Sequence, residues 1–104
     1  MNNETKLMSV RDAIIMAMSE EMRSDENVFL MGEDVGIFGG DFGTSVGMLE
    51  EFGAERIRDT PISENAISGC AIGAAMTGMR PIVDVTFMDF VVYMMDNIVN
   101  QAAK

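Results

Sequence analysis

Hydrophobic positions follow two alternating patterns along this chain, a helical spacing and short unbroken runs. The first helical pattern covers residues 10–23 and is preceded by Ser9, in a segment of the capping-box type. An apolar run at residues 28–31 then ends at Gly32, as a strand buried on both faces does. The patterns therefore predict an amphipathic helix followed by a buried strand.

The same alternation continues to the last residue. It predicts a short helix, a strand, a longer helix, a strand and a final helix, over residues 45–52, 57–59, 64–78, 81–87 and 89–104. Gly53 and Gly78 stop two of these helices, whereas no stop signal follows the last one. Strands that alternate with helices are typical of an α/β architecture, a parallel sheet with helices on both faces.

The predicted sheet is thin for an open parallel fold, which usually has more than three strands. The length of 104 residues allows one small domain, and the hydrophobic content of 48% is ample for a core. We therefore expect residues 1–104 to be the N-terminal part of a larger α/β domain. Such a part leaves apolar surface uncovered, so we also expect a dimer or a larger assembly.

Composition argues against several classes of partner. The net charge is −10, with 17 acidic and 7 basic residues and no basic cluster, which disfavours nucleic acid and anionic membrane surfaces. The single cysteine, Cys70, stands in an apolar run, so we expect a small buried thiol and a reducing compartment. The longest uncharged stretch, residues 65–79, is too short to span a bilayer, and residues 1–6 show no signal-peptide pattern. These features predict a soluble cytoplasmic protein.

Six glycines stand between residues 32 and 47, together with Glu33, Asp34 and Asp41. They predict a long loop at the carboxyl end of a strand, where parallel sheets bind their ligands. The glycine spacing fits neither common nucleotide fingerprint, and the acids would repel phosphate unless a divalent metal intervened. Two interpretations remain, a surface loop whose glycines need positive φ angles and a loop that lines a site.

The chain has no histidine. A serine or cysteine nucleophile would lack its usual base, a zinc site would lack ligands, and no calcium-loop pattern is present. Carboxylate acid–base chemistry remains, and Glu64 is the strongest candidate because it opens an uncharged helix of small residues. The structural alternative is an acid that only stabilises the helix dipole. In the same helix Gly69 and Gly73 share a face, which would let another helix approach closely, in this subunit or across an interface.

Four segments resemble the β subunit of thiamine-diphosphate-dependent 2-oxo acid dehydrogenase E1 components. They read MGEDVG at residues 31–36, RDTPISE at 58–64, GAAMTGMRP at 73–81 and TFMDF at 86–90. The resemblance extends over residues 8–104. Two segments, GGDFGTS at residues 39–45 and FMDF at residues 87–90, are most similar to the acetoin dehydrogenase branch, with pyruvate dehydrogenase a near neighbour. It implies that residues 1–104 are part of a transketolase-type pyrimidine-binding domain. The remainder of that domain, a C-terminal domain and a monovalent cation site would lie beyond Lys104.

The resemblance also implies roles for three residues. Glu64 would hydrogen-bond N1′ of the cofactor's aminopyrimidine and favour the imino form that removes the thiazolium C2 proton. Phe90 would pack against the pyrimidine ring, although a core position is the alternative, and Glu33 would line the cofactor end of a channel that joins paired active sites. The family's metal–diphosphate motif is absent here, so the partner α subunit would hold Mg²⁺ and the diphosphate, and this chain would hold no metal.

The leading hypothesis is cleavage of acetoin with thiamine diphosphate. The acetyl unit would pass to a lipoyl group on an E2 partner, and the enzyme would be an α2β2 heterotetramer. One alternative keeps this chemistry and makes pyruvate the substrate. The other is a non-catalytic module that joins subunits. Because the chain would hold only half of a site, we expect it to be inactive alone.

Overall fold

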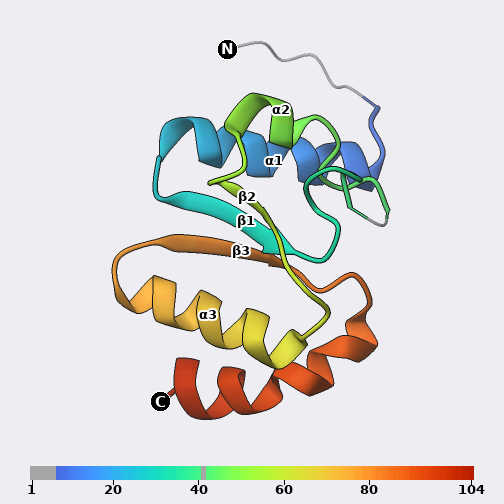
Figure 1. Ribbon diagram of the computed structural model, residues 1–104. Helices are drawn as coiled ribbons and strands as arrows, with labels where there is room; N and C mark the ends of the chain where they lie inside the picture. Colours follow the sequence, from blue (N-terminus) through green and yellow to red (C-terminus); the bar gives the residue numbers. More distant parts are fainter. Residues whose placement is uncertain (1–6, 41) are drawn as a thin grey trace.

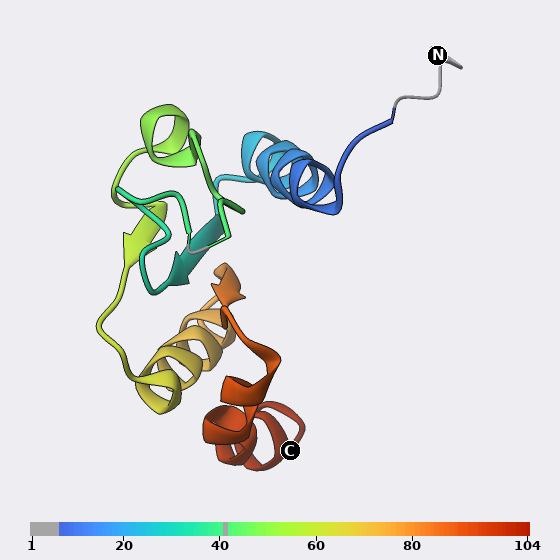
Figure 2. The same cartoon turned by 90° about the vertical axis from the view of Figure 1, so that its right-hand side faces the viewer.

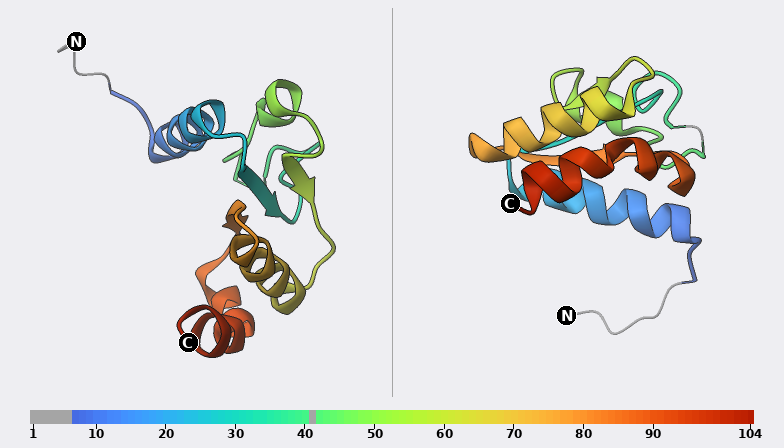
Figure 3. Two further views of the ribbon diagram at one scale, coloured as in Figure 1. Left: turned by 90° about the vertical axis from the view of Figure 1, so that its left-hand side faces the viewer. Right: turned by 90° about the horizontal axis from the view of Figure 1, so that it is seen from below.

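The computed structural model describes residues 7–40 and 42–104 as three layers, with a parallel sheet between two layers of helices (Figure 1). The strands are β1 (Val28–Gly32), β2 (Ile57–Asp59) and β3 (Arg80–Asp84), in the order β2-β1-β3. Both pairings are parallel. The predicted α/β architecture with helices on both faces is confirmed, and views from the sides show the same layers (Figures 2 and 3).

One face of the sheet carries α1 (Val10–Ser24) and α2 (Met48–Phe52), and the other carries α3 (Glu64–Met76) with the C-terminal helices (Figure 1). The predicted start of α1 is confirmed, because the Ser9 hydroxyl accepts a hydrogen bond from the Asp12 amide at 3.1 Å. No helix within the described residues combines the length and the apolar character needed to cross a membrane.

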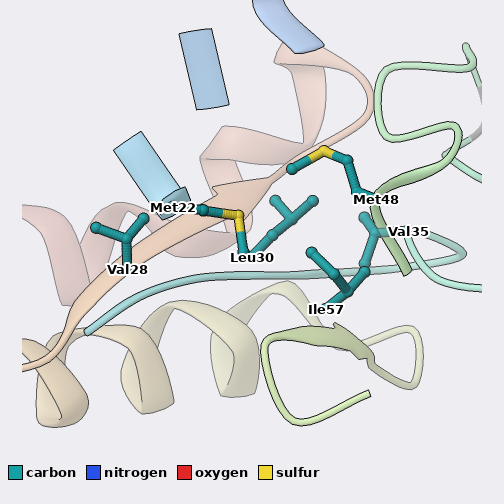
Figure 4. Packing of buried hydrophobic residues seen from close by; sticks show 6 residues of the cluster. All are labelled: Met22, Val28, Leu30, Val35, Met48 and Ile57. Atoms are coloured by element: carbon teal, nitrogen blue, oxygen red, sulfur yellow. The ribbon is translucent and has the colours of Figure 1, made fainter. Parts of the chain in front are cut away.

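The sheet separates two hydrophobic clusters, and all five residues of β1 are buried between them. The first cluster lies toward α1 and α2 (Figure 4) and consists of Met22, Val28, Leu30, Val35, Met48 and Ile57. The second lies toward α3 and consists of Phe29, Met31, Ile67, Ala71 and Met94. Successive β1 side chains alternate between the two clusters, which confirms that this strand is buried on both faces.

Two predicted boundaries are wrong at their carboxyl ends. Strand β3 ends at Asp84 instead of residue 87, because the Asp84 carboxylate accepts the Thr86 amide at 2.8 Å and turns the chain away. Helix α3 ends at Met76, two residues early, and the backbone reverses at Gly78 with φ of +98°. In both places the chain leaves regular structure through a positive φ angle, at Thr86 and at Gly78.

The predicted final helix over residues 89–104 is not one regular α-helix. It consists of a 3₁₀ helix, η1 (Met88–Met94), and a π-helix, η2 (Asn97–Ala102), which runs alongside α3 (Figure 3). Of the apolar side chains in this segment only Met94 is buried. Polar contacts join this segment to α3, since Asn97 Nδ2 lies 2.9 Å from the Asn65 carbonyl oxygen and 2.9 Å from Ser68 Oγ.

Two predictions concern α3, a buried thiol at Cys70 and a close helix approach at Gly69 and Gly73. Cys70 is exposed, so the prediction of a buried thiol is wrong; α3 buries Ile67 and Ala71 instead. A side chain added at Gly69 would meet Asn97 at 3.6 Å, so the close approach at Gly69 occurs within this chain. At Gly73 no atom of residues 7–40 or 42–104 lies within 4 Å of the corresponding position.

An ion pair between Arg23 and Glu51 joins α1 to α2, and it should make the stability of the fold depend on pH. Arg23 Nε lies 2.6 Å from Glu51 Oε2, and Arg23 Nη2 lies 2.7 Å from Glu51 Oε1. These hydrogen bonds and the Arg23 charge lower the pKa of Glu51 below the ordinary 4.5. The pair therefore stabilises the fold above that pH, and its contribution is lost as the pH falls through the lowered pKa.

Replacing Glu51 with glutamine should reduce the free energy of unfolding near neutral pH, and the difference from wild type should shrink as the pH falls below 4.5. The effect should be small because both side chains are substantially exposed. Urea unfolding across this pH range measures it. The control is Glu50→Gln on the same helix, and an equal, pH-independent loss in both variants would contradict the assignment.

Candidate functional site

The carboxyl ends of the three strands meet at one edge of the sheet, on the right in Figure 1. Gly32 at the end of β1 pairs with Asp59 of β2 on one side and with Asp84 of β3 on the other, so the three residues form one row. The segments that follow this row carry the candidates from the sequence, Glu33, Glu64 and Phe90. The fold thus brings residues from three distant segments to the edge where parallel sheets bind ligands.

Glu64 is the first residue of α3 and is partly buried. Among the described residues, the preceding Ser63 makes no side-chain hydrogen bond that caps the helix. Glu64 is the acidic residue of the first turn. The unpaired amides of this turn favour a negative charge. This placement is compatible with both interpretations of Glu64, helix stabilisation and proton exchange with a ligand.

Phe90 lies in η1, partly buried and outside both core clusters. Its ring meets the edge of Phe87 at a centroid distance of 5.4 Å and an interplanar angle of 78°. Phe87 in turn meets Phe42 of the glycine-rich loop at 5.3 Å and 80°. Phe90 is therefore held at the carboxyl edge by T-shaped contacts that link three aromatic rings, and not by the core.

The glycine-rich loop folds back over this edge. The expectation of positive φ angles is confirmed at Gly39, Gly40, Gly43 and Gly47. The Gly40 amide donates to the Asp34 carbonyl oxygen at 2.7 Å, and the Gly36 amide donates to Asp59 Oδ1 at 2.7 Å. A side chain at Gly36 would collide with that carboxylate. Asp59 thereby fastens the loop to β2; the predicted acid Asp41 lies outside the described residues.

Sequence reasoning missed Thr60, which directly follows β2. Within the described part of the chain, Thr60 Oγ1 is buried without a hydrogen-bond partner. An unpaired buried hydroxyl costs about 1–3 kcal/mol, and native proteins seldom keep one without a use for it. Thr60 stands inside the RDTPISE segment, but a single threonine in a loop has no pattern that would identify it.

Thr60 also lines a cavity of about 470 Å³ between β2 and α3. Met31, Pro61, Cys70 and Ala74 contribute to its walls. A smaller cavity of about 130 Å³ adjoins it along α3, again with Thr60 and Cys70 in its lining. The unpaired hydroxyl therefore lies beside mostly apolar space. The smaller cavity reaches the Glu64 end of α3 at Ser63 and Ala66, whereas the larger one extends toward the other end of this helix at Ala74 and Met79.

Replacing Thr60 with valine should raise the free energy of unfolding by about 1 kcal/mol, because it removes an unpaired buried hydroxyl and keeps the branched shape. Urea unfolding without ligand measures the change. The control is Thr77→Val, since the Thr77 hydroxyl donates to the Ala74 carbonyl oxygen at 2.8 Å and its loss should not stabilise. Destabilisation by Thr60→Val would mean that the hydroxyl is satisfied in the folded protein.

Comparison with known proteins places this arrangement in a family. Residues 6–104 match the family described as the transketolase pyrimidine-binding domain. The chain is 52% identical over 98 residues to the 2-oxoisovalerate dehydrogenase subunit beta of Bacillus subtilis. This match covers 94% of the chain and 30% of that relative. It is 48% identical over 101 residues to the pyruvate dehydrogenase E1 component subunit beta of Rhizobium meliloti, covering 97% of this chain and 22% of that protein.

A mitochondrial pyruvate dehydrogenase E1 component subunit beta from Saccharomyces cerevisiae is 44% identical over 102 residues, 98% of this chain and 28% of that protein. The chain thus spans less than a third of the length of each of these relatives. The matches confirm the resemblance found in the four sequence segments. The chain belongs to the family of transketolase-type pyrimidine-binding domains.

Proposed function

We propose that this chain forms the pyrimidine side of a thiamine diphosphate site in the β subunit of an E1 component, an oxidoreductase of the 2-oxo acid dehydrogenase type. The observation that carries the proposal is the position of Glu64, an acid at the start of α3 on the carboxyl edge of the sheet. The names of the relatives support the same class of enzyme subunit.

The residues at this edge fit an aminopyrimidine. Such a ring has apolar faces and a polar rim, so it needs an aromatic or aliphatic surface beside hydrogen-bonding groups. Phe90 offers an aromatic surface outside the core, Glu64 offers a carboxylate, and Thr60 offers a buried hydroxyl that has no partner within the described chain. An orphaned hydroxyl is the kind of group that a ligand satisfies.

Each residue then has a distinct role. Glu64 would hold a proton at N1′ of the pyrimidine, and Phe90 would keep the ring in the plane that this hydrogen bond requires. Glu33, which follows β1 at the same edge, would line the polar approach to the cofactor. When bound, thiamine diphosphate supplies a carbon nucleophile for addition to the substrate carbonyl group.

The diphosphate end of the cofactor requires a partner. Asp34, Asp59 and Asp84 stand near the carboxyl edge, in a chain with a net charge of −10, and so oppose the binding of a diphosphate here. We therefore assign Mg²⁺ and the diphosphate to an E1 α subunit in an α2β2 heterotetramer. A lipoyl-bearing E2 would accept the acetyl unit.

The substrate that we propose is acetoin, on the resemblance carried by residues 39–45 and 87–90. Pyruvate is the second candidate, favoured by the names of several relatives. The full-length β subunit, assembled with its α subunit, should release acetaldehyde from acetoin with a kcat/KM on the order of 100-fold above that for pyruvate. The reverse preference would identify a pyruvate dehydrogenase. Failure to turn over acetoin, pyruvate or 2-oxoisovalerate, the compound named in another relative, would favour the non-catalytic module.

A further inference from the structure

The chain makes a strained turn immediately after β3. Thr86 has a φ angle of +71°, in a region that β-branched residues rarely occupy. The Phe87 amide donates to the Val85 carbonyl oxygen at 2.8 Å, which closes a three-residue γ-turn centred on Thr86. The γ-turn with positive φ at its centre is rare and strained, and such turns persist only where the surroundings hold them.

Asp84 is the group that holds this turn. Its Oδ1 accepts the Thr86 amide at 2.8 Å, and its Oδ2 accepts the Thr44 hydroxyl of the glycine-rich loop at 3.3 Å. The strand pairing brings Gly32 so close that an added side chain would lie 2.9 Å from Asp84 Cβ. The carboxylate is thus fixed from two sides and joins the turn to the loop.

The turn determines where the next aromatic ring lies. Phe87 directly follows Thr86, and its ring makes edge contacts with Phe42 of the loop and with Phe90 of η1. The Phe90 amide also donates to the Phe87 carbonyl oxygen at 3.0 Å. The position of Phe90 therefore depends on Phe87. The position of Phe87 depends in turn on the turn at Thr86, which Asp84 stabilises.

We infer that Asp84 is a positioning residue for the cofactor ring, acting through the Thr86 turn and Phe87 on Phe90. This inference rests on the proposed function, which gives Phe90 the pyrimidine contact. Asp84 itself would not touch the cofactor. Its carboxylate keeps the strained turn closed, so that Phe90 is held in place before the cofactor binds.

The test uses the full-length β subunit assembled with its α subunit, with thiamine diphosphate binding followed by calorimetry. Asp84→Ala should weaken binding about tenfold, the factor that corresponds to the loss of one well-placed aromatic contact. Asp84→Asn should restore most of the affinity, because the amide oxygen can still accept the Thr86 amide. Amide hydrogen exchange at Thr86 and Phe87, measured without cofactor, should accelerate in Asp84→Ala and return toward wild type in Asp84→Asn.

Asp25→Ala is the matched control. Asp25 Oδ1 accepts the Asn27 amide two residues ahead at 2.9 Å, the same bond as at Asp84, but just before the amino end of β1. This variant should lower stability without changing cofactor affinity or exchange at Thr86. Equal loss of affinity in Asp25→Ala and Asp84→Ala would overturn the inference, since it would mark a general loss of stability.

A double-mutant cycle with Phe90→Leu separates the inference from the proposed function. If Asp84 acts through Phe90, Asp84→Ala should add little in a protein that already carries Phe90→Leu. Weaker binding in Phe90→Leu with normal binding in Asp84→Ala would overturn only the inference, whereas normal binding in Phe90→Leu would overturn the pyrimidine contact as well. Phe87→Leu, at a half-exposed position, gives the same readout if Asp84→Ala fails to assemble, and normal affinity in that variant would overturn the inference.

Discussion

Replacing Glu64 with glutamine should slow exchange of the thiamine diphosphate C2 proton by roughly 10²–10⁴-fold in the full-length α/β enzyme, the usual worth of a positioned acid or base. Glutamine preserves the size and a hydrogen bond but cannot hold the ionisable proton at N1′. The rate is measured by nuclear magnetic resonance after transfer of the loaded enzyme into deuterium oxide.

The control for this prediction is an acid in the first turn of another helix. Glu50 stands in the first turn of α2, as Glu64 does in α3, but it is exposed, and α2 lies on the opposite face of the sheet. Glu50→Gln should leave the exchange rate unchanged while it removes a comparable interaction with a helix dipole. Unchanged exchange in Glu64→Gln would reduce Glu64 to that dipole role.

Arg56→Met should lower the free energy of unfolding by about 3 kcal/mol. Arg56 Nη2 lies 2.6 Å from the Met22 carbonyl oxygen and 2.9 Å from each of the Asp25 and Val28 carbonyl oxygens, so it joins the end of α1 to the start of β1. The guanidinium also lies 5.2 Å above the Phe52 ring. Hydrogen bonds to a charged group contribute about 1.5–3 kcal/mol each, but bonds from one group are not additive.

Arg58, in β2, is the comparison for Arg56, which directly precedes that strand. It is exposed, and its side chain donates from Nε to the Glu55 carbonyl oxygen at 2.8 Å. Arg58→Met should change the free energy of unfolding by less than about 0.5 kcal/mol. Urea unfolding of both variants measures the difference, and equal effects would show that the carbonyl cluster around Arg56 contributes nothing to stability.

Elements with a strong periodic signal could be predicted from the sequence. The unbroken run at β1 predicted a strand buried on both faces, and Ser9 predicted the start of α1. In both cases one local rule, burial or capping, agrees with the tertiary structure. The edge of the sheet that carries Glu64 followed from the same alternation, because parallel strands place their carboxyl ends together.

Features that depend on individual side-chain contacts, or on which way a helix faces, could not be predicted. A threonine is a poor candidate for positive φ, so only the Asp84 carboxylate explains the turn at Thr86. The final segment has a helical pattern, yet the bonds of Asn97 to α3 accompany π rather than α geometry. Cys70 stands in an apolar run, but the helix turns it away from the buried stripe. The Thr86 turn thus depends on a side chain two residues earlier, and the final segment depends on contacts with α3, in which Asn65 stands 32 residues before Asn97.

The central claim is that this chain supplies one half of a thiamine diphosphate site, and calorimetric titration of the cofactor with Mg²⁺ tests it most directly. The titration is made into the α subunit alone, the full-length β subunit alone and their assembly, with wild-type and Glu64→Gln β. We predict tight binding only in the wild-type assembly and weaker binding when Glu64 is replaced. Equal affinity of α alone and of both assemblies would contradict the claim, because the pyrimidine side of the site would then lie elsewhere.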